Sequence, residues 1–512
     1  MKQFKFKVIS LLLCMLTMVV TGCKDEEEAI FNADEQESVG LTVSSKGIMI
    51  DRNGGTATIT VSSEYYWNIY GGADWCELSS NSGNPGETRE ITITAGKNEG
   101  VAARYVTLYA RSGFDKIDIS VLQPGANYVE PDQTEMETDI FDLIYSITNG
   151  WNLGNTMEAW VSWDLNNEAF GTGESMETAW GNPAATQELI DCVYEHGFRG
   201  IRIPCKWDVY YMDMKDPAAV DYKIHPNWFK RMREVVDYCM KYPDLKVLMN
   251  THNGDWDRAC MEDSVSKYEP ILFKVWTQIA ENFRDYDERL MFGTVNEPAA
   301  ETAEQCAVLC KYEQASINAI RSTGGRNAHR VIVFQAPNTN FELSLSSMKM
   351  PVDYIADRLA MEVHFYAPST FCMLEDASWG YAAYFWGNNY LQEPINGIDR
   401  NSYYNEEYID GLFPQMKEKF FDNGIPIIIG EYGAALKDLS FSPTLQEIHN
   451  KSYVYYHKYV VENLKKYGMV PFLWDNGSLF DRNTYEIKQA LQWEGIKVAL
   501  DAAYPYQAKK NF

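Results

Sequence analysis

Positive charge is scarce in this sequence of 512 residues. Lysine and arginine total 45 against 72 aspartates and glutamates, so the formal net charge is −27 and the pI is near 4.7. Long-range repulsion opposes the approach of such a chain to a nucleic-acid backbone or an anionic membrane surface, which argues against both as partners. A neutral polymer substrate is compatible with this charge.

Cofactor and metal motifs are also missing. Cys14 and Cys23 lie near the N-terminus, and the other eight of the ten cysteines lack CxxC pairs or zinc-like spacing. Most of those eight fall in apolar segments, which favours buried free thiols over occasional disulfides. Because no nucleotide, flavin or metal motif is present, we expect no cofactor and no metal.

The N-terminal hydrophobic run is too short to cross a bilayer comfortably. It spans 8–20 and follows three lysines, which is typical of a signal peptide over 1–22. The end of this segment resembles a bacterial lipobox, in which Cys23 would receive a lipid and become the mature N-terminus. An ordinary signal peptide with an incidental cysteine is the alternative.

An acidic tether over 23–38 follows the expected anchor. Its charged start, 24–28, has no periodic apolar face and is similar to the export tags of surface lipoproteins in Bacteroidetes-type cells. We therefore expect a protein on the bacterial cell surface or outer membrane, with membrane contact through the lipid at Cys23 only.

Long helical periodicity is absent from 39–125. Short alternating stretches separated by turn residues predict a small all-β sandwich there. Trp67, Trp75 and the closing residues 119–124 resemble the BACON domain, an immunoglobulin-like sandwich often found before carbohydrate-active catalytic domains. The tryptophans could stack on sugars, but core positions are favoured, so we expect a spacer. Polar residues over 126–137 predict a linker.

Eight apolar runs alternate with helical segments over 138–512. This pattern requires a parallel sheet covered by helices, and eight repeats predict a (β/α)8 TIM barrel. The fold class is therefore α/β, with the all-β sandwich before the barrel. Asn182 and Pro183 predict the start of one helix. The expected strand ends are 151–153, 200–204, 246–250, 292–297, 331–334, 361–364, 427–431 and 471–474.

Polar residues directly follow these runs, at the end of the barrel where active sites are built. Glu297 follows the fourth run and Glu431 the seventh. Two carboxylates in one cleft can divide the acid and nucleophile roles of glycosidic cleavage, with retention of configuration if they lie about 5–5.5 Å apart. The alternatives are a structural salt bridge for either glutamate, or a metal site made from His252, His364 and a glutamate.

Five motifs in order resemble glycoside hydrolase family 5: 150–159, 177–183, 201–204, 296–298 and 474–477. The first two and the last resemble its subfamily 4, whose members act on β-glucans. The resemblance implies Glu297 as acid/base and Glu431 as nucleophile. The remaining candidate substrate-binding residues are Asn152, Asn155, Arg202, His252, Asn253, Asn296, His364, Tyr366, Trp474, Asp475 and Asn476.

The expected electrostatics divide the two glutamates. Arg202 and Tyr366 should keep Glu431 ionised, whereas a raised pKa should keep Glu297 protonated. One position departs from the family pattern, because many relatives have a second histidine where this chain has Asn253, and an amide cannot carry charge. Loop tryptophans could line an extended cleft or pack the loops on the barrel: Trp160, Trp163, Trp180, Trp207, Trp256, Trp379 and Trp386.

With the paired glutamates, the resemblance implies a retaining, endo-acting hydrolase of β-1,4-glucosidic bonds in a plant β-glucan, such as xyloglucan, mixed-linkage glucan or cellulose-like chains. A β-mannanase or glucomannanase is one alternative, because the two sugars differ only at C2. A non-catalytic surface glycan-binding lipoprotein is the other. The presence of both glutamates argues against it, because binding alone needs neither.

Overall fold

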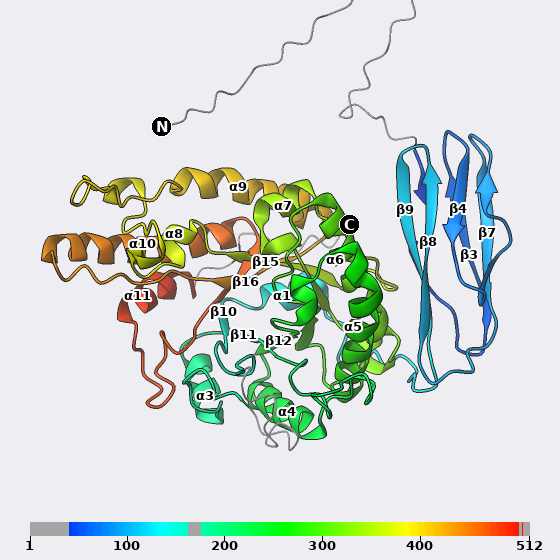
Figure 1. Cartoon of the computed structure of the whole chain (residues 1–512), viewed down its shortest axis with the longest axis horizontal. Helices are drawn as coiled ribbons and strands as arrows, with labels where there is room; N and C mark the ends of the chain where they lie inside the picture. The colour runs from blue at the N-terminus through cyan, green and yellow to red at the C-terminus, as the bar shows by residue number, and fades with distance from the viewer. Residues whose placement is uncertain (1–39, 162–175, 501–503, 505–512) are drawn as a thin grey trace, which may run out of the picture.

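The computed structural model describes residues 40–161, 176–500 and 504 (Figure 1). The expected signal peptide, the tether with Cys23, and Trp163 lie outside these residues. None of the helices in the described ranges is long and apolar enough to span a membrane.

The N-terminal part consists of two β-sheets packed face to face, as the alternating pattern predicts. Inward-facing Ile59, Val61, Ile91 and Ile93 form its core. The first sheet contains, in order, β1 (Thr42–Val43), β3 (Gly55–Ser62), β7 (Thr88–Ala95) and β5 (Cys76–Leu78). The second contains β2 (Gly47–Met49), β9 (Asp115–Gln123), β8 (Arg104–Ser112), β4 (Trp67–Gly71) and β6 (Ser82–Gly83).

The two tryptophans of this part differ in exposure. Trp67 is fully buried, and Gly83 packs so closely on its ring that a β-carbon at that position would lie 2.3 Å from it. Trp75 is half-buried, with the Arg104 guanidinium 4.6 Å from its ring centroid. Trp67 is therefore a core residue and cannot offer its face to a sugar.

Eight parallel strands close into a barrel, which confirms the predicted (β/α)8 fold. Trp151 on the first strand pairs with Ile201 on one side and with Leu473 of the last strand on the other. The strands are β10 (Gly150–Asn152), β11 (Gly200–Ile203), β12 (Lys246–Asn250), β13 (Leu290–Gly293), β14 (Ile332–Gln335), β15 (Leu359–Phe365), β16 (Ile427–Tyr432) and β17 (Met469–Leu473).

Helices cover the outside of this barrel (Figure 1). Their apolar stripes pack on strands that are buried on both faces, such as β13. The α-helices are α1 (Ile140–Tyr145), α3 (Gln187–Glu195), α4 (Pro226–Met240), α5 (Glu262–Asn282), α6 (Ala303–Arg321), α7 (Phe341–Ser346), α8 (Ser369–Cys372), α9 (Glu406–Lys419), α10 (Pro443–Lys466) and α11 (Ala490–Leu500).

The helix expected to start at Asn182 begins later. Thr186 caps α3 by accepting a hydrogen bond from the Leu189 amide. Asn182 instead donates its side-chain amide to the backbone oxygens of Gly154, Asn155 and Asn476. It therefore joins the loops that follow the first and last barrel strands.

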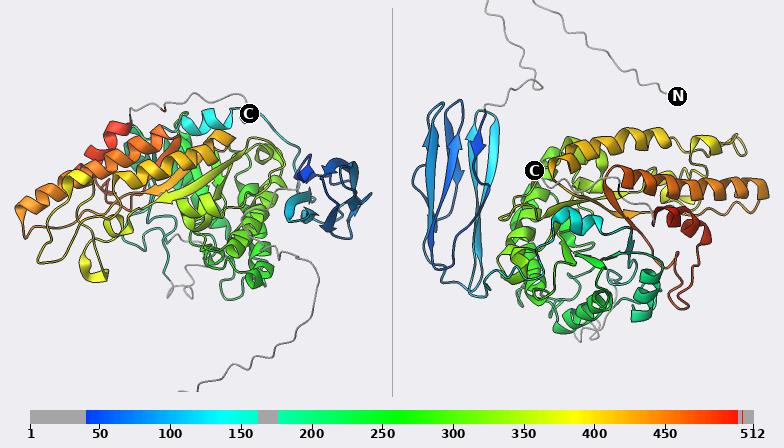
Figure 2. Two further views of the ribbon diagram at one scale, coloured as in Figure 1. Left: turned by 90° about the horizontal axis from the view of Figure 1, so that it is seen from above. Right: turned by 180° about the vertical axis from the view of Figure 1, so that it is seen from behind.

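The sandwich lies against α5 and α6, as both views in Figure 2 show. Tyr105 of β8 stacks on Phe273 of α5 with ring centroids 5.1 Å apart, and its hydroxyl donates to Glu269 at 2.9 Å. Ser120 of β9 shares a 2.6 Å hydrogen bond with the Tyr354 hydroxyl. These contacts join the sandwich directly to the barrel.

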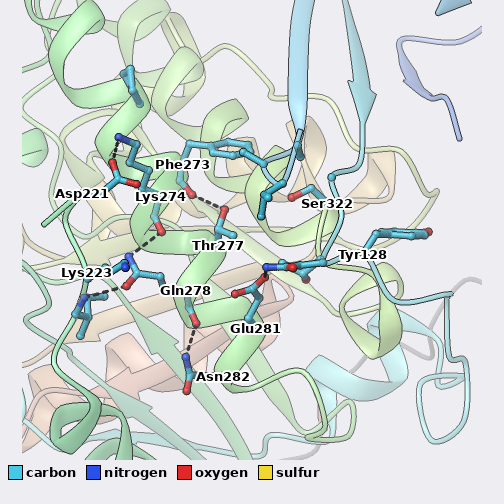
Figure 3. A pocket seen from close by; sticks show the side chains of 18 of the residues that line it. Tyr128, Asp221, Lys223, Phe273, Lys274, Thr277, Gln278, Glu281, Asn282 and Ser322 are labelled. Atoms are coloured by element: carbon cyan, nitrogen blue, oxygen red, sulfur yellow. Dashed lines mark hydrogen bonds and ion pairs between the residues drawn. The ribbon is translucent and has the colours of Figure 1, made fainter. Parts of the chain in front are cut away.

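A cavity of about 950 Å³ remains at this junction (Figure 3). Polar side chains that line it bind neighbouring protein groups: Gln278 donates to the Tyr222 oxygen, and Asn127 donates to Glu281. Lys274 forms an ion pair with Asp221. These hydrogen bonds and this ion pair therefore hold the side chains of the cavity wall in place.

Candidate active site

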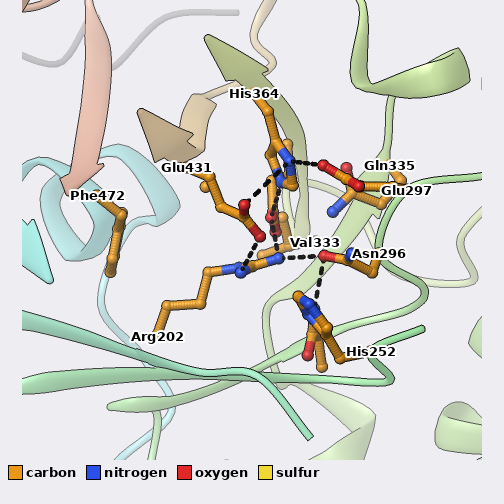
Figure 4. Close-up of polar contacts among 12 residues, drawn as sticks. Arg202, His252, Asn296, Glu297, Val333, Gln335, His364, Glu431 and Phe472 are labelled. Carbon is orange, nitrogen blue, oxygen red and sulfur yellow. Dashed lines mark hydrogen bonds and ion pairs between the residues drawn. The ribbon is translucent and has the colours of Figure 1, made fainter. Parts of the chain in front are cut away.

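The two candidate glutamates meet at the carboxyl end of the barrel. β13 ends at Gly293, earlier than expected, so Glu297 stands in the loop after it, whereas Glu431 lies within β16. One side-chain oxygen from each glutamate and a ring nitrogen of His364 lie within 4.8 Å of one another. Both carboxylates therefore face one space, Glu297 from the loop after β13 and Glu431 from β16 (Figure 4).

Arg202 is the central cation of this site. It is fully buried, and its Nη1 donates to Glu431 at 2.9 Å and to Asn152 at 3.0 Å. Its Nη2 donates to the side-chain oxygen of Asn296 at 2.7 Å, which leaves the Asn296 amide NH2 as the group that can donate to a sugar hydroxyl. Tyr366 donates its hydroxyl to the other oxygen of Glu431 at 3.1 Å.

His364 connects the two glutamates. Its Nδ1 lies 2.9 Å from Glu297 and 3.8 Å from Glu431. Its Nε2 lies 3.1 Å from Glu362, a buried carboxylate that the sequence analysis missed. Residues two apart on a strand face the same side, so the position of Glu362 two residues before His364 was the available signal.

The pKa shifts of the two glutamates run opposite to the expected ones. Burial would raise the pKa of Glu297, but the hydrogen bond and charge of His364, together with Arg202, outweigh burial and lower it. Burial raises the pKa of Glu431 by more than His364 and Arg202 lower it. The raised pKa expected for Glu297 is therefore wrong, because His364 contacts Glu297 more closely and Glu431 is more deeply buried.

Stability should fall in alkaline solution because of His364. Burial would lower its pKa, but Glu431, Glu297 and Glu362 raise it from 6.5 to about 9. The resulting stabilisation is complete below pH 6.5 and is lost as the pH rises through 9. At 1.36 kcal/mol per pKa unit, we expect a loss of about 3 kcal/mol in the free energy of unfolding. Urea unfolding at both pH values measures it.

His364→Gln is the matched control for this pH dependence. Other buried groups also titrate in this range, including Glu313, whose pKa burial raises to about 8. Only the difference between wild type and His364→Gln reports the histidine. If the free energy of unfolding changes equally with pH in the two proteins, His364 does not hold the extra proton.

His252 and Trp474 lie close together across the barrel mouth. Their rings are nearly parallel, with centroids 6.0 Å apart, and burial followed by the charge of Arg202 lowers the pKa of His252 well below its usual range. A neutral His252 can accept or donate one hydrogen bond at each ring nitrogen. Asn253, next along the chain, has a left-handed backbone with a φ of 53°, and its backbone oxygen accepts a hydrogen bond from Lys206.

Three expected substrate-binding residues are fully buried, so they cannot contact a sugar. Asp475 accepts hydrogen bonds from Trp151 Nε1 and from the backbone amides of its own loop. Asn152 donates to the Gly430 oxygen, and Arg202 is enclosed by its carboxylate and amide partners. These three residues hold neighbouring groups of the site in place through hydrogen bonds, which corrects the role expected for them.

Asn155 and Asn476 lie nearer the surface. Asn155 is half-buried with a φ of 54°, and its backbone amide donates to the buried Glu158 at 2.5 Å. Asn476 is exposed. The backbone oxygens of both accept from Asn182, so this amide fixes their loops at the rim.

A second cavity, of about 670 Å³, starts at Lys206 and Asn253, just beyond the ends of β11 and β12. Trp160 and Trp180 line it, with Trp180 40% exposed and the Lys206 Nζ 5.2 Å from the Trp160 ring centroid. Trp207, Trp256 and Trp386 are buried and pack the loops on the barrel instead. The side chain of Trp379 lies outside the described residues.

The cluster of Glu297, His364 and Glu431 is compact enough to raise the question of a metal ion. Two features of the donor set disfavour one: His364 already contacts both Glu297 and Glu362, and the Arg202 cation lies 2.9 Å from Glu431. His252 stacks on Trp474 rather than joining the cluster. We expect equal hydrolysis rates before and after dialysis against EDTA, and a loss that added Zn²⁺ or Mg²⁺ restores would contradict this.

Residues 163–479 match the family described as Cellulase (glycosyl hydrolase family 5). The chain belongs to glycosyl hydrolase family 5. This family consists of retaining hydrolases, and the match covers all but the first of the barrel strands. The presence of both Glu297 and Glu431 in this fold argues for catalysis rather than glycan binding alone.

Similar proteins act on or bind β-glucans. The chain is 30% identical over 518 residues to the xyloglucan-specific endo-β-1,4-glucanase BoGH5A of Bacteroides ovatus, covering 97% of each chain. A solved Bacteroides ovatus family 5 xyloglucanase in complex with a XXXG heptasaccharide superposes with a TM-score of 0.68 at 29% identity, covering 90% of this chain and 100% of that one. A GH5-4 broad specificity endoglucanase from Ruminococcus champanellensis with bound cellotriose gives a TM-score of 0.58 at 26% identity, covering 70% and 99%.

Proposed function

We propose that this family 5 enzyme cleaves the β-1,4-glucosidic backbone of xyloglucan, with Glu431 as nucleophile and Glu297 as acid/base. The observation that carries the proposal is the approach of the two carboxylates to within 4.8 Å. Retaining enzymes hold this pair about 5–5.5 Å apart, whereas inverting enzymes need about 6.5–9.5 Å to admit a water. The pair is therefore spaced for direct attack on the sugar.

In the first step Glu431 attacks the anomeric carbon while Glu297 protonates the leaving oxygen. The donors from Arg202 and Tyr366, at 2.9 and 3.1 Å, occupy one lone pair on each oxygen of Glu431 and aim the carboxylate. In the second step Glu297, now ionised, takes a proton from water, which attacks the glycosyl-enzyme and releases Glu431.

Substrate binding supplies the condition for protonating Glu297. Its side chain is 48% exposed, and a glucan that covers it removes the water that stabilises its charge. The cluster contains three carboxylates and the cations Arg202 and His364, so one added proton makes it neutral. Glu297 is the most exposed of the three, so it loses the most solvent when a glucan covers it, and its pKa rises the most on binding.

The second cavity, of about 670 Å³, supports binding of several sugar units beyond the ends of β11 and β12. Trp160 and Trp180 offer ring faces for stacking, and Lys206 and Asn253 offer polar groups at the same wall. A site extended in this way favours cleavage within a chain. The broad-specificity relative with bound cellotriose supports mixed-linkage glucan and cellulose-like chains as further substrates of this subfamily 4-like enzyme.

Reducing-sugar release from xyloglucan, barley β-glucan, carboxymethylcellulose and glucomannan, measured in parallel with product analysis, tests this function. We expect the highest rate on xyloglucan, and oligosaccharides of several units as the early products. A highest rate on glucomannan would support the mannanase alternative instead. Release of single end units from the start would contradict endo cleavage.

We also propose that the chain is a surface lipoprotein anchored at Cys23, with the sandwich as a BACON-type spacer. The lipobox-like residues and the acidic tether support the anchor, and the buried position of Trp67 supports a structural role for the sandwich. Cys23→Ser should release the enzyme from the membrane fraction. Persistence of this variant in the membrane fraction would contradict a lipid anchor.

A further inference from the structure

Glu362 lies at the centre of the charged cluster, yet it cannot touch a substrate. It is fully buried on β15, and its Oε1 lies 2.9 Å from Arg202 Nη2 and 3.1 Å from His364 Nε2. The same two cations reach the catalytic pair: Arg202 Nη1 donates to Glu431 at 2.9 Å, and His364 Nδ1 lies 2.9 Å from Glu297. One carboxylate oxygen thus connects to both glutamates, each through one cation.

We propose that Glu362 is a positioning residue that holds Arg202 against Glu431 and His364 against Glu297. The proposal rests on the roles proposed for those two glutamates. An imidazole with both nitrogens protonated has two donors in opposite directions, and Glu362 accepts one while Glu297 accepts the other. Glu362 therefore fixes both the ring orientation and the proton count of His364.

The backbone beside the nucleophile reserves space for this carboxylate. A β-carbon at Gly430 would lie 1.9 Å from Glu362 Oε1, well inside any permitted contact. Only glycine leaves room there for the Glu362 head group, directly before Glu431 in the chain. The local sequence of β16 is thus adapted to the carboxylate on β15.

The charges that face His364 come from several strands. Glu362 comes from β15, Glu431 from β16, Glu297 from the loop after β13, and Arg202 from β11. After burial and the charge of Arg202, the charge of His364 is in turn one of the causes that lower the pKa of His252, which follows β12. Glu362 is the one carboxylate among them that is fully buried, so its charge is the least screened by solvent.

Glu362→Gln tests the proposal by removing the charge and keeping the shape. We expect kcat/KM on xyloglucan to fall about 100-fold, because small misplacements of catalytic groups have effects of that size. Selectively ¹⁵N-labelled histidine, assigned with His364→Gln, should show the His364 pKa falling by about one unit or more, as expected when a buried charge partner is lost. A residue needed only for packing would not move this titration.

Glu313→Gln is the matched control. Glu313, on α6, is also a fully buried carboxylate, but it accepts hydrogen bonds from Thr294 and the Gln335 backbone amide rather than pairing with a cation. Burial raises its pKa to about 8, so it already carries a proton near neutral pH and glutamine mimics that form. We expect this variant to keep wild-type activity and an unshifted His364.

Several results would overturn the proposal. One is wild-type activity together with an unchanged His364 titration in folded Glu362→Gln. In that case the activity of the wild-type enzyme on xyloglucan would still support the proposed function. If Glu362→Gln fails to fold, the ¹⁵N spectrum of the wild-type protein tests the proposal instead. It should show both His364 nitrogens protonated at neutral pH, and a neutral imidazole there would rule out the assigned role.

Discussion

Glu431→Gln is expected to lower xyloglucan hydrolysis by roughly 10⁴-fold or more, the scale seen when a covalent nucleophile is removed. The amide keeps the shape of the side chain and can still accept from Tyr366 at one oxygen. It cannot attack the anomeric carbon, so no glycosyl-enzyme forms. Initial-rate assays on xyloglucan measure the loss.

Azide distinguishes a lost nucleophile from a damaged site. In Glu431→Ala, azide can occupy the vacated space and attack directly, which gives a glycosyl azide of inverted, α configuration. Glu269→Gln, on α5 at the sandwich junction, is the control and should keep full activity. A β-glycosyl azide from Glu431→Ala would mean that another residue is the nucleophile.

Glu297→Ala should lower hydrolysis of natural glucan by about 10²–10⁴-fold, the usual contribution of general acid–base catalysis. A 2,4-dinitrophenyl leaving group needs no protonation, so the first step on such a substrate should stay fast. It should release a burst of 2,4-dinitrophenolate before the slow second step. Stopped-flow absorbance detects this burst.

The same variant gives a product test. Azide should accelerate the second step of Glu297→Ala and give a glycosyl azide of retained, β configuration, because it attacks the covalent intermediate. Equal loss on natural and activated substrates, without a burst, would contradict the acid/base role. The two alanine variants should therefore give azides of opposite configuration, which no general disruption of the fold would produce.

The barrel and its two glutamates were predictable because their signals are local in the chain. Apolar runs alternate with amphipathic helices, and Glu297 and Glu431 stand directly after two of those runs. Parallel strands bring their carboxyl ends to one edge, so adjacency in space followed from position in the pattern. The closed order of β10 to β17 confirms that inference.

The partners of those glutamates were not predictable in the same way. Glu362 stands between Met361 and Val363 and looks like one polar residue inside an apolar strand. Its role becomes visible only when Arg202, 160 positions earlier, is brought to 2.9 Å from it. The pKa directions of Glu297 and Glu431 depend on the same tertiary contacts, which is why the raised pKa expected for Glu297 was wrong.

Asp475 illustrates a misleading local signal. It follows the last barrel strand in a family motif, which suggested contact with substrate. Its carboxylate instead accepts from the amides of Gly477 and Leu479 and from Trp151, so it stabilises its own loop. A short acidic side chain before a turn often binds nearby backbone in this way.

The docking of the sandwich on α5 bears on how this enzyme could be trimmed or recombined. Removing residues 40–125 would uncover the face of Phe273 that Tyr105 covers and strip Tyr354 of its Ser120 partner. A shortened version would expose a fresh apolar surface, and precipitation rather than loss of chemistry would limit its use. The N-terminal part therefore cannot be exchanged freely between enzymes, because the matching surface of α5 would have to be transferred with it.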